Sequence, residues 1–179
     1  GGLKLQSFFE QYPLTVKGIN FLDLGASTGG FSDYLLQNGA KSATCVDVGH
    51  GQLHYKLRTD PRVTNLEKTN LRNLTDEKLE NAPFPLIVMD LSFISLVKVL
   101  NRAWSFLAIG GHLITLVKPQ FESTKREADQ GRGIIRDESI HKRVLNEITK
   151  FANENLDNSE FFAQTESSPR GTDGNIEFF

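Results

Sequence analysis

The 179-residue sequence predicts an α/β fold, in which helices cover both faces of a doubly wound, mostly parallel β-sheet. Short apolar runs alternate along the chain with amphipathic segments, and a glycine-rich turn joins the first run to the segment that follows it. Successive strand–helix–strand units of this kind form right-handed crossovers between parallel strands. We expect only the last strand to run antiparallel.

The first half of the chain predicts two helices of normal length, one short helix and three strands. The helices have apolar residues at helical spacing and end at Pro13 and at Asn38-Gly39, whereas the strands are short apolar runs. In chain order, the expected elements are helix Leu3–Tyr12, strand Asn20–Leu24, helix Gly30–Gln37, strand Ser42–Val46, a short helix within Gln52–Arg58, and strand Val63–Leu66.

The second half continues the alternation and ends in two strands. The run before Asp90 is apolar throughout, as in a strand covered on both faces. Gly110-Gly111 is expected to end one long helix and Asp137 to cap another. In chain order, the expected elements are a helical turn Thr75–Leu79, strand Leu86–Asp90, helix Ser95–Ala108, strand His112–Val117, an irregular segment Gln120–Arg136, a helix from Asp137 to about Asn155, and strands Phe161–Glu166 and Asn175–Phe179.

Length and composition indicate one soluble domain. The net charge is −2, and no apolar run approaches the roughly 20 residues of a membrane span, so we expect a cytoplasmic protein without a membrane partner. The single cysteine, Cys45, lies in an apolar strand pattern and is expected to be a buried thiol. No cluster of histidine and cysteine offers a metal site. The start at Gly1-Gly2, without an initiator methionine, indicates a piece of a longer protein.

The glycine-rich turn Asp23–Phe31, D-L-G-A-S-T-G-G-F, is the strongest indication of a ligand site. Glycines allow a close backbone approach to a ligand, and the helix that follows offers free N–H groups. The spacing differs from dinucleotide and phosphate motifs, because Ser27 replaces the second glycine of one and no lysine follows Gly30. Asp47, after the next strand, is placed to hold the hydroxyls of a nucleoside, although it could also be a turn residue. S-adenosylmethionine fits this arrangement best.

Three charged residues lie at or within apolar strands, where a solvated surface does not explain them. They are Asp90, Lys118 and Glu177. Taken singly, Asp90 could be a cap, Lys118 an edge lysine, and Glu177 an outward-facing residue. A charge in a buried strand is costly unless it is paired, so together they favour a site at one edge of the sheet. Phe31, Phe93 and Trp104 are most simply core residues, although Phe31 could also form a wall beneath a cofactor.

Six strings in order along the chain resemble the TlyA, or hemolysin-A-like, branch of the FtsJ-type RNA ribose methyltransferases. They are Asp23–Phe31, Val46–Leu53, Met89–Leu96, Val117–Glu122, Gly131–Asp137 and Gly174–Phe178. The resemblance implies a Rossmann-like fold and methyl transfer from S-adenosylmethionine to a ribose 2′-hydroxyl of rRNA, with rRNA or a ribosomal subunit as partner. It also implies that residues 1–179 are the methyltransferase domain and that the family's N-terminal RNA-binding domain is absent from this chain.

The resemblance also assigns site residues. The family's catalytic Lys-Asp-Lys-Glu set falls on Lys4, Asp90, Lys118 and Glu177. We expect Lys118 to orient the hydroxyl and accept its proton; a lysine that stays protonated would instead steer the hydroxyl and stabilise developing charge while the proton leaves to water. Asn70 lies where related enzymes often have an acid that meets the adenine. The cofactor contacts fall on Gly25, Ser27, Gly29, Gly30, Phe31, Asp47, Asn70 and Asp90.

The irregular segment Gln120–Arg136 carries four cations that could contact RNA phosphates: Lys125, Arg126, Arg132 and Arg136. A solvated loop is an equal alternative, supported by Glu127 and Asp129. Other functions also stay open at this point: a membrane-active cytolysin, a catalytically silent RNA-binding module and, more distantly, a dehydrogenase. The apolar stripes of the helices suit core packing and disfavour a cytolysin. The complete Lys-Asp-Lys-Glu set disfavours a silent module, and the glycine spacing disfavours a dehydrogenase.

Overall fold

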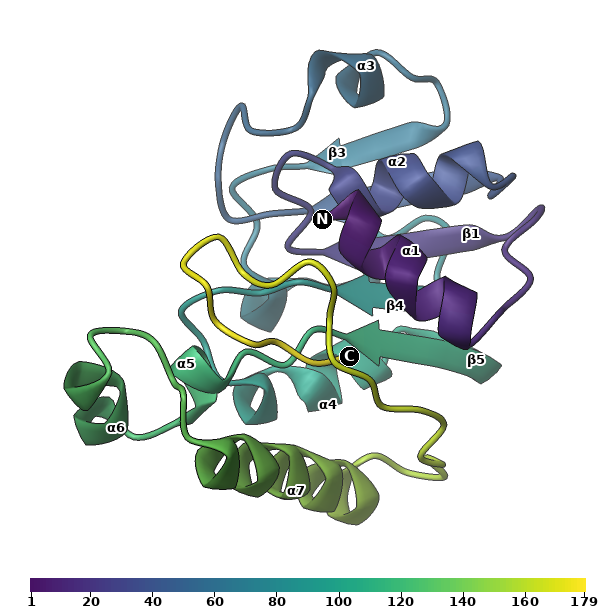
Figure 1. Ribbon diagram of the computed structural model, residues 1–179. Helices are drawn as coiled ribbons and strands as arrows, with labels where there is room; N and C mark the ends of the chain where they lie inside the picture. The colour runs from purple at the N-terminus through teal and green to yellow at the C-terminus, as the bar shows by residue number, and fades with distance from the viewer.

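A computed structural model describes residues 1–179 and contains a five-stranded sheet flanked by helices (Figure 1). All four strand pairings are parallel, and the strand order is β3-β2-β1-β4-β5. The strands are β1 (Asn20–Leu24), β2 (Ser42–Val46), β3 (Val63–Leu66), β4 (Phe84–Met89) and β5 (Leu107–Thr115). The helices are α1 (Gly2–Gln11), α2 (Gly30–Gln37), α3 (Tyr55–Arg58), α4 (Leu100–Trp104), α5 (Pro119–Glu122), α6 (Lys125–Gln130) and α7 (Glu138–Asn155), with 3₁₀ turns η1 (Leu71–Asn73), η2 (Asp76–Lys78) and η3 (Leu96–Lys98).

Two apolar cores lie on opposite faces of the sheet because strand side chains alternate in direction. Phe21 of β1 packs in one core with residues of α1 and α2, whereas its neighbour Leu22 packs in the other with residues of α4 and α7. The doubly wound arrangement expected from the sequence is therefore confirmed. No helix has both the length and the apolar character needed to cross a membrane.

The winding of the chain reverses between β1 and β4. β1 pairs with β2 on one side and with β4 on the other, so the connections leave the two central strands in opposite directions. In open α/β sheets, ligands bind in the crevice beyond the carboxyl ends of the strands at such a switch point. Gly25 follows β1 and Asp90 follows β4, which places both at this crevice.

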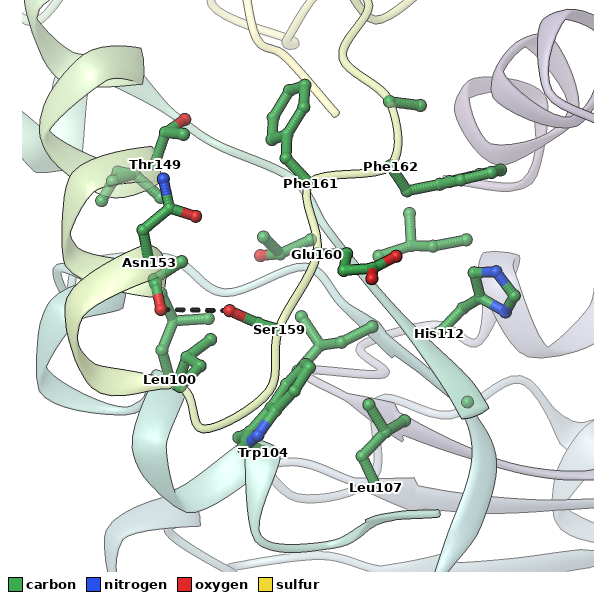
Figure 2. Close-up of a pocket in the computed structure, with 18 of the residues that line it drawn as sticks. Leu100, Trp104, Leu107, His112, Thr149, Asn153, Ser159, Glu160, Phe161 and Phe162 are labelled. Carbon is green, nitrogen blue, oxygen red and sulfur yellow. Dashed lines mark hydrogen bonds between the residues drawn. The ribbon is translucent and has the colours of Figure 1, made fainter. Parts of the chain in front are cut away.

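The two expected C-terminal strands are reduced to isolated antiparallel bridges. Phe178 pairs with Val117 on one side and with Glu166 on the other, so the antiparallel direction is confirmed. Residues 160–164 pair with no strand. They leave an apolar groove of about 730 Å³ beside β5 and α7, with Phe161 and Phe162 along it (Figure 2).

The helix predicted over Ser95–Ala108 is wrong in its extent. Its apolar stripe is buried as expected, but the backbone leaves the helical conformation at Val99, and β5 already begins at Leu107. The carbonyl of Phe106 accepts a hydrogen bond from the Phe84 N–H at 2.8 Å, which draws the chain into the sheet. Gly110 and Gly111 consequently lie in a bulge of β5 instead of ending a helix.

The segment predicted as irregular, Gln120–Arg136, contains most of α5 and all of α6. A capping box begins α6: the Thr124 hydroxyl accepts from the Glu127 N–H, and the Glu127 carboxylate accepts from the Thr124 N–H. This pattern of threonine followed three residues later by glutamate is visible in the sequence. The charged composition of the segment obscured it, because α6 buries no residue.

Candidate active site

The turn after β1 brings the backbone directly against the end of β4. Gly25 has φ +82°, and a Cβ there would overlap the Asp90 carbonyl oxygen. Only glycine satisfies both conditions, since other residues avoid this conformation and need the occupied space. The Gly25 N–H also donates to the Val46 carbonyl at 2.8 Å, so the turn is anchored to β2 as well.

The second half of the turn begins α2. Of its two glycines, both predicted to contact a cofactor, Gly30 lines a cleft and Gly29 faces other side chains. Gly30 packs against Gly2, at the start of α1. Gly29, with φ +94°, lies against Leu53 and Leu57.

Phe31, the next residue of the turn, is only 3% exposed, and its ring centroid lies 6.0 Å from that of Phe179. The first turn of α2 directs this ring into the core, as expected for a core residue, and its second role as a wall beneath a cofactor stays a prediction.

Asp47 and Asn70 follow β2 and β3 at the same edge of the sheet. The Asp47 carboxylate accepts hydrogen bonds from the Ser27 N–H at 2.8 Å and the Gly49 N–H at 2.7 Å. An ionised carboxylate has further lone pairs, so its fixed oxygens can still accept hydroxyl donors. Asn70 is exposed and caps η1, with Oδ1 accepting from the Arg72 N–H at 2.9 Å. Its amide nitrogen makes no hydrogen bond within the protein.

Asp23 is a buried acid behind the turn that the sequence did not single out as a site residue. It is 1% exposed, and its Oδ2 accepts from the Ser32 hydroxyl at 2.7 Å, while Oδ1 has no partner. Burial raises the pKa of the Asp23 carboxyl to about 7, and the nearby charges of Asp90 and Asp47 act in the same direction. The signal was an aspartate inside the apolar run F-L-D-L.

Asp23→Asn should stabilise the protein above neutral pH. The folded state holds the Asp23 proton to about pH 7, whereas the unfolded chain releases it near the ordinary aspartate pKa of 3.8, so the free energy of unfolding falls as pH rises between these values. A difference of about three in pKa lowers the free energy of unfolding of the wild type by about 4 kcal/mol. The side-chain amide of Asp23→Asn does not ionise and so avoids this loss, and its oxygen can still accept the hydrogen bond from Ser32. Urea unfolding at pH 5 to 8 measures the difference. Asp76→Asn, on an exposed turn, is the control. If the stability gained by Asp23→Asn does not grow with pH, the raised pKa of Asp23 is contradicted.

The four residues assigned to the Lys-Asp-Lys-Glu set form two ion pairs. Lys118 Nζ lies 2.7 Å from Asp90 Oδ1 and donates to the Ser92 hydroxyl at 3.1 Å. Lys4 Nζ lies 2.6 Å from Glu177 Oε2. All four side chains line one cleft of about 870 Å³, together with Ser27 and Gly30 of the glycine turn.

Each charged side chain is held by a different part of the fold. Asp90 is fixed because its N–H donates to the Leu24 carbonyl at 3.0 Å, and Lys118 immediately precedes α5, where Pro119 begins the helix. Glu177 adjoins the bridge of Phe178 to Val117. Its Oε1 accepts from the Gln120 amide at 3.2 Å, which links the two ion pairs through the start of α5.

Phe93 is exposed, which contradicts its prediction as a core residue. The side chain is 90% exposed, the backbone has φ +63°, and the ring centroid lies 4.8 Å from that of Phe121. Both rings line the cleft. The apolar string around Phe93 gave no sign of this, because the left-handed backbone at Phe93 turns the ring outward. Trp104, in contrast, packs against the core as expected.

The four predicted phosphate-binding cations are exposed, and none forms an ion pair: Lys125, Arg126, Arg132 and Arg136. Glu127, which had supported the solvated-loop alternative, is engaged elsewhere. Its carboxylate accepts from Arg143 at 2.6 and 2.7 Å, and this guanidinium lowers the pKa of Glu127 to about 2. Glu127 therefore does not pair with these four cations, whereas Asp129 in the same segment is exposed and forms no ion pair.

Comparison with known proteins agrees with this geometry. The sequence matches the FtsJ-like methyltransferase family over residues 1–179. The chain belongs to this family. Among FtsJ-like relatives, it is 41% identical over 99% of its length to a candidate rRNA methyltransferase, YqxC, from Bacillus subtilis. It is 40% identical over its full length to the 16S/23S rRNA (cytidine-2′-O)-methyltransferase TlyA of Mycobacterium tuberculosis. The resemblance inferred from the six strings is thus confirmed.

A solved structure matches over nearly the whole chain. A candidate hemolysin from Streptococcus thermophilus superposes with a TM-score of 0.93 and 41% identity, covering 99% of this chain and 63% of that one. The chain spans 62% of the length of the Bacillus relative and 65% of the Mycobacterium relative. This FtsJ-like sequence therefore corresponds to about two thirds of these longer proteins.

Proposed function

We propose that residues 1–179 form the catalytic domain of an rRNA 2′-O-ribose methyltransferase that uses S-adenosylmethionine. The observation that carries the proposal is the single cleft in which Lys4, Asp90, Lys118 and Glu177 meet beside the glycine turn. These residues are far apart in the sequence, and membership of a methyltransferase family is consistent with the reaction.

The residues around the turn fit S-adenosylmethionine. Asp47 and Asp90 follow β2 and β4, the two strands on either side of β1, where negative charge complements a cationic cofactor. Gly25 lets the turn lie directly against the end of β4, and the fixed Asp47 oxygens can accept hydrogen bonds from ribose hydroxyls. When bound, the cofactor supplies an electrophilic methyl group.

Lys118 and Asp90 are the candidates for orienting the ribose hydroxyl. Asp90 Oδ1 lies 2.7 Å from Lys118 Nζ, which directs this nitrogen into the cleft; there the neutral amine can contact the hydroxyl and accept its proton, becoming an ammonium that Asp90 stabilises. Lys4 and Glu177 line the same cleft and fix each other. Holding two reactants at attack distance can supply about 7–11 kcal/mol of the activation barrier.

The rim of the cleft favours a nucleic-acid substrate. Phe93 and Phe121 present aromatic faces beside the charged residues, and a stacked base contributes about 1–3 kcal/mol on such a surface. Lys125, Arg126, Arg132 and Arg136 supply exposed positive charge for phosphates. The M. tuberculosis relative is named for the ribose position of rRNA cytidines, which supports rRNA as the substrate class here.

The direct test is incubation of the protein with ribosomal subunits and S-adenosylmethionine carrying a labelled methyl group. The proposal expects label in the rRNA. A protein that binds rRNA but transfers no label would be a catalytically silent module, whereas leakage of liposomes without methyl transfer would indicate a membrane-active function. Either result would contradict the proposal.

Arg132→Ala combined with Arg136→Ala should weaken rRNA binding and reduce its dependence on salt. Each lost phosphate contact lowers the slope of log K against log salt by roughly 0.7–0.9. Binding isotherms at several salt concentrations measure the slope. Lys17→Ala with Lys41→Ala, at the opposite edge of the sheet, is the matched control and should leave it unchanged. An unaltered slope in the arginine variant would assign these cations to a solvated surface.

A further inference from the structure

We propose that Asn175 and His141 are positioning residues that join the basic segment Gly131–Arg136 to the chain segment bearing Glu177. The inference rests on the proposed function and extends it. The surface that contacts RNA phosphates and one wall of the catalytic cleft are held together as a unit, although neither Asn175 nor His141 lines that cleft.

Asn175 is fully buried and uses its whole side chain to connect two segments. Nδ2 donates to the Gly133 carbonyl at 2.9 Å, and Oδ1 accepts from the Ile135 N–H at 2.9 Å. Nδ2 also donates to Asp173 Oδ2 at 2.6 Å. Because carbonyl and carboxylate oxygens only accept and a backbone N–H only donates, these partners determine the orientation of the amide.

His141 makes a second connection between the same two segments. It is buried in the first turns of α7, and its Nε2 lies 2.9 Å from the Ile135 carbonyl oxygen. The carbonyl can only accept, so Nε2 carries the proton. The opposite contact of the ring is with Phe178, next to Glu177, at 5.5 Å between centroids in an edge-to-face arrangement.

The contacts of Asn175 and His141 lie between the exposed arginines of the basic segment and the turn that lines the cleft. On one side, Arg132 and Arg136 flank the backbone groups that Asn175 binds, and both are exposed. On the other side, the Asn175 carbonyl accepts from the Gly171 N–H at 3.0 Å, which holds the turn that lines the cleft. Glu177, two residues further along the chain, pairs with Lys4 in that cleft.

Removal of the Asn175 side chain leaves the Ile135 N–H and the Gly133 carbonyl without their buried partners. Such groups recover hydrogen bonds only if the segment moves toward water. The basic segment and the turn at Gly171 are then released together. The sheet core and the glycine turn of the cofactor site have no part in these contacts, so they stay in place.

The test compares Asn175→Ala and His141→Phe with the control Asn146→Ala, on the exposed face of α7, all in the full chain. His141→Phe keeps the ring against Phe178 and removes only the hydrogen bond, which covers the case in which Asn175→Ala fails to fold. Hydrogen–deuterium exchange of the protein alone should show faster exchange in residues 131–136 and 167–177 together, with β1 unchanged. The control should exchange like the wild type.

Kinetics of methyl transfer to rRNA provide the second measurement. Asn175→Ala should raise KM for rRNA and lower kcat, each by about tenfold, with S-adenosylmethionine affinity within about twofold of the wild type. The double substitution Arg132→Ala with Arg136→Ala should raise KM in the wild-type background and have little further effect in the Asn175→Ala background.

Two results would overturn the link: faster exchange in only one of the two segments, or an undiminished effect of the arginine substitutions in the Asn175→Ala background. The exchange measurement requires no substrate. If the wild-type protein transfers no methyl group to rRNA, the proposed function fails, and the exchange result alone decides whether the two segments are joined.

Discussion

Lys118→Ala should lower methyl transfer by on the order of 10³-fold, the range expected when a positioned proton-transfer group is removed. Lys118 is the cation that Asp90 and Ser92 hold in the cleft, with Nζ 2.7 Å from one and 3.1 Å from the other. Its loss removes the group proposed to contact the hydroxyl. The glycine turn and Asp47 are untouched, so the affinity for S-adenosylmethionine should change by no more than about twofold.

Single-turnover methyl transfer and calorimetric titration of the cofactor separate these two effects. Lys98→Ala, at an exposed lysine of η3, is the matched control and should retain full activity. Full activity of Lys118→Ala would remove Lys118 from the mechanism. A parallel loss of cofactor affinity would instead assign it to cofactor binding.

Gly25→Ala should destabilise the protein by about 3 kcal/mol and abolish cofactor binding. An alanine at φ +82° costs about 1 kcal/mol or more, and its methyl group overlaps the Asp90 carbonyl oxygen, which adds the cost of forcing β1 and β4 apart. The crevice at the switch point of the sheet would then lose its shape at the place where the proposed cofactor lies.

Gly18→Ala is a closely matched control, because Gly18 has φ +78° but open space around its Cα. Gly18→Ala should lower the free energy of unfolding only by the cost of the left-handed backbone conformation, about 1 kcal/mol. Urea unfolding of both variants, followed by cofactor titration, measures the two terms. Equal losses of stability would mean that the close approach of Gly25 to Asp90 contributes nothing.

Elements specified by local signals were predicted well from the sequence. β1, α2 and β2 begin and end at the expected residues, because an apolar run, a glycine turn and the Asn38-Gly39 stop all lie within them. The helix over Ser95–Ala108 failed because a tertiary hydrogen bond from Phe84 to Phe106 overrides a pattern that suits a helix equally well.

The site was predicted in part. The unusual placement of Asp90, Lys118 and Glu177 in apolar strands was visible in the sequence, and the family resemblance added Lys4, whose ion pair spans 173 positions of the chain. Phe93 and Asn175 could not be assigned in this way. The exposure of one and the burial of the other depend on backbone turns and contacts between segments distant in the sequence.

The central claim is that this cleft methylates a ribose hydroxyl, and the position of the transferred methyl group tests it most directly. rRNA treated with the protein and heavy-methyl S-adenosylmethionine can be digested to nucleosides and analysed by mass spectrometry. We expect the heavy methyl group on the 2′-oxygen of a ribose, at a level that falls to background with Lys118→Ala. A methyl group on a base, or equal labelling by Lys118→Ala, would contradict the account.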